Sequence, residues 1–142
     1  MANVIYNRFK SGLLAGDFDL DTGGNTIKVA LVTSTYTPDI DTHEDFADIT
    51  NEVTGTGYTA GGETLASQAV TKDTTDDEGV FDAADVTWST STITARGAVV
   101  YKDTGTPATS LLICYFDFGS DQSSSSGDFT ITWNSEGIIN VG

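Results

Sequence analysis

Phe129-Thr130-Ile131-Thr132-Trp133 alternates large apolar residues with threonine. Successive side chains of a β-strand point to opposite faces, so this pattern predicts a strand with one buried and one solvent-facing side. We therefore expect Phe129, Ile131 and Trp133 to point inward together. Threonine and the aromatic residues also favour strands over helices.

The same signal extends through most of the chain. Residues 111–118 are almost wholly apolar, which predicts a strand buried on both faces. In residues 92–101 Gly97 interrupts the alternation and predicts a bulge, while Ile93, Ala95, Ala98 and Val100 are expected to point mostly inward. Further strands are expected at residues 27–32, 63–71, 79–82, 85–88 and 137–141.

About seven short strands separated by turn signals are typical of an antiparallel β-sandwich or a jelly roll. The chain has 142 residues, enough for one hydrophobic core, so we expect a single domain spanning residues 1–142. Residues 26–142 form the sandwich in this interpretation. Residues 1–25 form an N-terminal helix or arm followed by an acidic turn.

The N-terminal segment carries Ile5, Phe9 and Leu13 at the spacing of one helical face. We expect a short helix with Asn3 as its N-cap and Gly16 as its stop. An extended arm is the alternative, because Gly12 weakens a helix.

Further along the chain, residues 41–49 could hold a second short helix, capped by Thr42 with acidic residues in its first turn. Residues 54–62 contain four glycines, which predicts a flexible loop rich in turns.

The net charge is −15, from 21 acidic residues against six Lys and Arg. Nucleic-acid binding needs clustered cations, and anionic membranes attract basic segments, so we expect neither partner. No apolar stretch approaches the length of a membrane span. Cys114 is the single cysteine and lies in an apolar run, so it is expected to be a small buried hydrophobe.

The sequence offers no pattern typical of catalysis, cofactor binding or a metal site. Asp17, Asp19 and Asp21 resemble a calcium loop, but its twelfth position is Lys28, which cannot bind calcium. An irregular oxygen-ligand site remains the alternative there. His43 is the only histidine and lies in an acidic segment, where we expect a surface or capping role.

Aromatic residues suggest both a core and an interface. Trp88 and Trp133 fall within expected strands, which favours core packing over an exposed platform for sugars. Tyrosines in less regular segments are better interface candidates, because Tyr is enriched at protein interfaces. Together with two apolar residues of the N-terminal segment, the candidate interface residues are Ile5, Tyr6, Phe9, Tyr36 and Tyr58.

Two stretches carry a resemblance to a known group of proteins. One consists of Lys28-Val29-Ala30-Leu31-Val32-Thr33-Ser34-Thr35-Tyr36-Thr37-Pro38-Asp39 and its continuation over residues 50–62. The other runs from Thr94-Ala95-Arg96 through residues 100–108 and 116–119 to residues 126–131 and Trp133-Asn134. Together they resemble small virion structural proteins of tailed bacteriophages, which are capsid decoration (cement) proteins or minor tail proteins.

The resemblance implies a non-enzymatic protein of the virion, assembled in the host cytoplasm. Its partners would be the major capsid protein or other virion proteins, and it would form a homo-oligomer, with a trimer as one arrangement. A tail, neck or baseplate component is the alternative within the same class. A carbohydrate-binding or adhesin module is the alternative from another class.

Overall fold

The computed structural model describes residues 2–142. The fold is mostly β, with 43% strand and 11% helix. The expected all-β fold with antiparallel sheets and one short N-terminal helix is therefore confirmed. In chain order the elements are β1 (Val4–Ile5), α1 (Asn7–Ala15), β2 (Ile27–Val32), the 3₁₀ helix η1 (Phe46–Asp48), β3 (Glu63–Thr64), β4 (Ala69–Asp73), β5 (Glu78–Asp82), β6 (Val86–Ser91), β7 (Thr94–Lys102), the 3₁₀ helix η2 (Pro107–Thr109), β8 (Leu112–Ser123), β9 (Gly127–Ile131) and β10 (Ile139–Val141).

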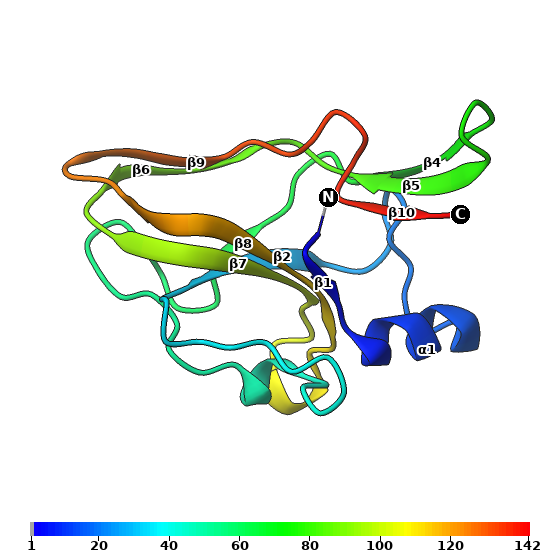
Figure 1. The fold of residues 1–142 in the computed structure, drawn as a ribbon, viewed down its shortest axis with the longest axis horizontal. Helices are drawn as coiled ribbons and strands as arrows, with labels where there is room; N and C mark the ends of the chain where they lie inside the picture. The colour runs from blue at the N-terminus through cyan, green and yellow to red at the C-terminus, as the bar shows by residue number, and fades with distance from the viewer. Residues whose placement is uncertain (1) are drawn as a thin grey trace.

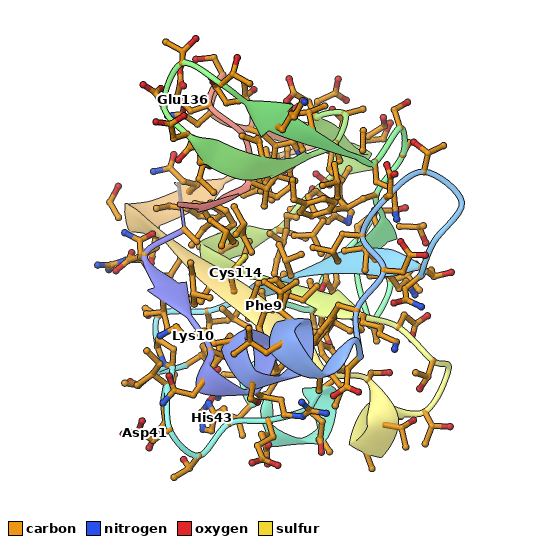
Figure 2. The ribbon with its side chains drawn as sticks, turned by 90° about the vertical axis from the view of Figure 1, so that its right-hand side faces the viewer. Phe9, Lys10, Asp41, His43, Cys114 and Glu136 are labelled. Carbon is orange, nitrogen blue, oxygen red and sulfur yellow. The ribbon has the colours of Figure 1, made fainter. Side chains whose placement is uncertain are left out.

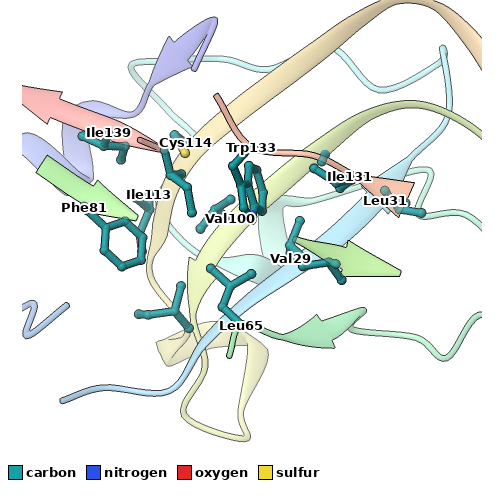
Figure 3. Packing of buried hydrophobic residues seen from close by; sticks show 14 of the residues in the cluster. Val29, Leu31, Leu65, Phe81, Val100, Ile113, Cys114, Ile131, Trp133 and Ile139 are labelled. Carbon is teal, nitrogen blue, oxygen red and sulfur yellow. The ribbon is translucent and has the colours of Figure 1, made fainter. Parts of the chain in front are cut away.

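The strands form two layers (Figure 1). One layer is a five-stranded sheet in the order β1-β8-β7-β2-β3. The other contains two smaller sheets, β6-β9 and β10-β5-β4. The main core lies between the layers, where Val29 and Val100 of the large sheet share one cluster with Phe81, Ile131 and Trp133 (Figure 3). Each layer buries its apolar face against the other, as in a sandwich.

The five-stranded sheet is buried on its second face as well. A separate cluster there includes Val32, Val99, Leu112 and Tyr115, with Phe46 of η1 packed against it. Covering both faces explains why the run at residues 111–118 shows no alternation. The inward direction predicted for Phe129, Ile131 and Trp133 is confirmed, since these side chains are only 7–8% exposed.

The bulge predicted at Gly97 is confirmed by a shift in the β7–β8 register between Ala95 and Gly97. A β-carbon at Gly97 would lie 2.5 Å from the Phe116 carbonyl oxygen and 2.6 Å from the Tyr115 ring. Glycine is therefore required here because the neighbouring strand approaches too closely for a side chain.

Three local expectations were wrong. The helix does not start after Asn3: Val4 and Ile5 pair with β8 first, and Tyr6 is the N-cap of α1. The helix does end at Gly16, which has the left-handed conformation expected of a stop. The strand expected over residues 63–71 is two separate strands, β3 and β4, which belong to different sheets.

The third wrong expectation is the cap of the helix at residues 41–49. The segment forms only η1, and its cap is Asp45 rather than Thr42. Asp45 and Asp48 accept each other's backbone N–H bonds in a capping box. Within residues 2–142, no helix is long and apolar enough to cross a membrane.

Candidate functional site

The structure places most of the candidate interface residues inside the chain's own fold. Tyr6, Phe9 and Tyr36 are 0%, 2% and 4% exposed, respectively. Ile5 and Tyr58 are half-buried and pack against the main core. Because a buried side chain cannot contact a partner without unfolding, Tyr6, Phe9 and Tyr36 stabilise the monomer and do not present a surface.

Tyr6, Tyr36 and His43 form a chain of hydrogen bonds beneath the large sheet. The hydroxyl groups of Tyr6 and Tyr36 are 2.8 Å apart, and the Tyr36 hydroxyl lies 2.9 Å from Nδ1 of His43. The backbone N–H of Asp39 also donates to this nitrogen, which makes Nδ1 an acceptor. Tyr36 therefore donates to His43 and accepts the hydrogen bond of Tyr6. Figure 2 labels His43 in the loop on this side of the molecule.

Burial governs the chemistry of both tyrosines. Loss of solvation raises the pKa of Tyr6 far above its usual range, and the same cause raises the pKa of Tyr36 to about 12. Both side chains therefore stay neutral over the physiological pH range. The arrangement acts as a structural hydrogen-bond chain that ties residues 36–43 to the start of α1.

This direction of donation predicts an asymmetry between two similar variants. Tyr36→Phe leaves the buried Tyr6 hydroxyl without its partner and should cost about 1–3 kcal/mol of unfolding free energy. Tyr6→Phe leaves the Tyr36–His43 bond intact and should cost less. Urea denaturation of the two single variants and the double variant measures this, and the double variant should cost less than Tyr36→Phe because it also removes the unpaired Tyr6 hydroxyl. Equal single costs would contradict the assigned direction.

Tyr58 lies in the glycine-rich loop but is not a mobile anchor. Its hydroxyl donates to Oε1 of Glu52 at 2.7 Å and accepts the backbone N–H of Leu31 at 2.9 Å. The same Glu52 oxygen accepts the N–H of Gly61 at 2.6 Å. The loop thus covers the edge of β2 beyond the short strand β3, where backbone groups would otherwise be unpaired.

Carboxylates of the acidic turns bind the chain's own backbone. Oδ1 of Asp21 accepts the N–H groups of Thr22 and Val70, and Oδ1 of Asp73 accepts those of Thr75 and Asp76. Within residues 2–142, nine aspartates accept backbone N–H groups: Asp19, Asp21, Asp39, Asp45, Asp48, Asp73, Asp85, Asp103 and Asp117. Much of the acidic composition therefore serves to fix turns.

The calcium-like turn follows the same rule. Oδ1 of Asp19 accepts the N–H of Asp21, and Oδ2 of Asp17 pairs with Arg8 at 2.8 Å. These oxygens are committed to donors of the chain instead of converging on one point. In residues 2–142, no cluster of three or more His, Cys, Asp or Glu is placed to hold a metal ion.

The turn aspartates predict sensitivity to acid. Hydrogen bonds from backbone N–H groups lower the pKa of Asp21, Asp73 and Asp117, and the Thr42 side chain followed by the Asp41 N–H lowers the pKa of Asp39. A carboxyl with a lowered folded pKa stabilises the fold above the ordinary Asp pKa of about 3.9. That stabilisation is lost as the pH falls through the folded value.

We therefore expect the melting temperature to fall as the pH is lowered below about 4. The measurement is a thermal melt series at high salt, which screens the general repulsion among the acids. Asp73→Asn keeps an oxygen acceptor but cannot titrate, so its melting temperature should fall less. An unchanged melting temperature down to the lowest pH would refute the stabilising role of these turns.

Other residues singled out in the sequence belong to the core. Trp88 and Trp133 are 1% and 8% exposed, so the expectation that they pack inside is confirmed. Cys114 is fully buried, as expected, and burial raises the pKa of its thiol. A thiol held protonated in this way is a weak nucleophile.

Sequence reasoning missed the apolar side chains that remain exposed. Leu14 is 91% exposed, and Leu13, which was expected on the buried face of the helix, is 37% exposed. Val70 and Val141 are 45% and 51% exposed.

Comparisons with known proteins add no relative: no family model matches the chain, and neither the curated proteins nor the solved structures give a match.

Proposed function

We propose that the chain is a structural protein of a tailed-bacteriophage virion, and specifically a capsid decoration (cement) protein bound to the outside of the head. The observation that carries this proposal is the resemblance to such proteins of residues 28–39 and 50–62, together with residues 94–96, 100–108, 116–119, 126–131 and 133–134. These residues fall in β2, β7, β8 and β9, which contribute to both layers of the sandwich. The resemblance therefore covers the frame of the fold and is not confined to one loop.

The physical properties of the chain support a structural role. Its charge of −15 keeps copies soluble at the high local concentration of an assembling particle. Its long connections are tied down by tyrosine and aspartate hydrogen bonds, so the surface that it offers a neighbour is preformed. Preorganised surfaces bind without a large ordering cost. The partner in this proposal is the major capsid protein, with copies arranged as a homo-oligomer.

One observation favours this role over a carbohydrate-binding or adhesin module. Such a module would expose a row of Trp or Tyr on a sheet face. Here Trp88 and Trp133 are buried between the layers, together with Phe129. The aromatic residues of the sandwich are thus engaged with each other and are not displayed to a sugar.

The test uses purified chain with heads and tails of the encoding phage that lack it, each sedimented separately. We expect saturable co-sedimentation with heads, and cryo-EM density on the outer surface of the decorated heads. An unrelated acidic protein of similar size controls for non-specific binding. Binding to tails alone would assign the protein to the tail, and binding to neither would refute the virion proposal. Binding on a glycan array instead would favour the adhesin alternative.

A further inference from the structure

An apolar groove lies between α1 and the three-stranded sheet β10-β5-β4. It has a volume of about 410 Å³, which is within the range of ligand pockets. Phe9 and Phe18 form one wall, and Phe81 and Ile139 form the opposite wall. Figure 2 looks onto this side of the molecule, with α1 and Phe9 below the strands of the small sheet. The groove is formed by one copy of the chain alone. Its role does not depend on the proposed virion function.

Exposed apolar side chains gather at this groove. Leu13, Val70 and Val141 line it, although they are 37%, 45% and 51% exposed. Leu14, at 91% exposed, follows directly on the same helix. Of the five exposed large apolar residues in residues 2–142, three therefore line this groove. Apolar surface concentrated in this way is typical of an interaction site.

Gly79 leaves the floor of the groove open. It lies inside β5, opposite Val141 of β10 and Lys72 of β4. A β-carbon at Gly79 would meet nothing closer than the Val141 carbonyl oxygen at 3.9 Å. Neither a close contact nor a left-handed backbone requires glycine here, yet glycine weakens a strand. Its effect is to keep space in the groove between the two neighbouring strands.

The charge around the groove is negative. Asp19 and Asp21 line it. Two cations nearby are already engaged, because Arg8 pairs with Asp17 at 2.8 Å and Lys102 donates to the Asp17 carbonyl oxygen while lying over the Phe18 ring. Lys72, opposite Gly79 in β4, is a third cation on this side of the sheet, and the two aspartates outnumber it. The whole chain carries a net charge of −15, which adds to this negative potential. An occupant with positive charge beside its apolar part is therefore attracted to this groove, whereas an acidic segment is repelled from it.

We propose that this groove binds a segment of a partner protein that inserts a large apolar side chain over Gly79 and places Lys or Arg beside Asp19 and Asp21. The inserted side chain is buried against Phe9, Phe18 and Phe81. The basic residues that flank it give the specificity and the fast association.

The probe is a random peptide library displayed on yeast, selected against the wild-type chain. We expect enrichment of peptides that carry a large apolar residue next to Lys or Arg. Their affinity should fall at least about tenfold for Gly79→Phe, because the new ring shares the face of Phe81 and fills the groove. Affinity for the wild type should also weaken as salt screens the charges.

Gly127→Phe is the matched control. Gly127 is a strand glycine of β9 with room for a β-carbon, since the nearest atom to that carbon would be the Ser125 carbonyl oxygen at 3.6 Å. This variant should bind the selected peptides like the wild type. Circular dichroism and a thermal melt of both variants show whether each is folded, and Gly79→Ala provides a milder filling of the same site.

Three results would overturn the proposal. No enrichment, or enrichment of peptides that bind Gly79→Phe as well as the wild type, would mean that the groove is not the binding site. Enrichment of acidic or uncharged peptides would refute the charge argument. Sedimentation equilibrium showing a wild-type dimer that Gly79→Phe dissociates would make a second copy the occupant.

Discussion

Gly62→Ala should destabilise the protein by about 3 kcal/mol or more, among the largest effects of a single methyl group. Gly62 has φ +77°, and an added β-carbon would overlap the Val29 carbonyl oxygen and lie 2.6 Å from the Val29 carbonyl carbon. Both atoms belong to the backbone of β2, which is paired along its whole length with β7 and cannot yield as a flexible side chain would. The loop at residues 54–62 would have to lift away from β2.

The matched control is Gly105→Ala. Gly105 has a similar φ of +84°, but its β-carbon would meet nothing within 4 Å. This variant isolates the cost of the left-handed backbone, about 1–2 kcal/mol. Denaturant unfolding of both variants gives the difference that belongs to the contact with Val29. Equal losses would mean that the loop is mobile after all, as its glycine content had suggested.

Phe9→Ala should cost about 3–5 kcal/mol of unfolding free energy. The side chain is 2% exposed and packs edge-on against Phe18, with ring centroids 4.9 Å apart. Its removal leaves a cavity between α1 and the sandwich that the surrounding strands cannot fill. The N-terminal segment is thus expected to be part of the folding unit, in contrast to an arm held ready for a partner.

Leu14→Ala on the same helix is the control for Phe9→Ala. Leu14 is 91% exposed, so its truncation should change the unfolding free energy by no more than about 0.5 kcal/mol. Chemical denaturation followed by tryptophan fluorescence reports both variants, because Trp88 and Trp133 are buried in the core. A Phe9→Ala loss as small as that of Leu14→Ala would show that α1 is undocked in solution.

The sequence by itself determined the β class, most of the strands and the direction of their side chains. The alternation at residues 129–133 fixed an inward face, because the two-residue period of a strand is a local property. Gly97 correctly predicted the bulge in β7, and Gly16 correctly predicted the end of α1, since both features depend on the backbone within a few residues. The absence of alternation at residues 111–118 correctly indicated a strand covered on both sides.

Only the tertiary structure decided which of the aromatic residues are available to a partner. Tyr36 and Tyr58 lie in irregular segments, and their burial depends on contacts with Tyr6, 30 residues away, and with Leu31, 27 residues away. The N-cap of α1 is Tyr6 and not the expected Asn3, because Val4 and Ile5 pair with β8 as strand β1. The groove is formed by α1, β5 and β10 together, and no local pattern joins segments from opposite ends of the chain. Long-range pairing sets these features, because it determines what covers each residue.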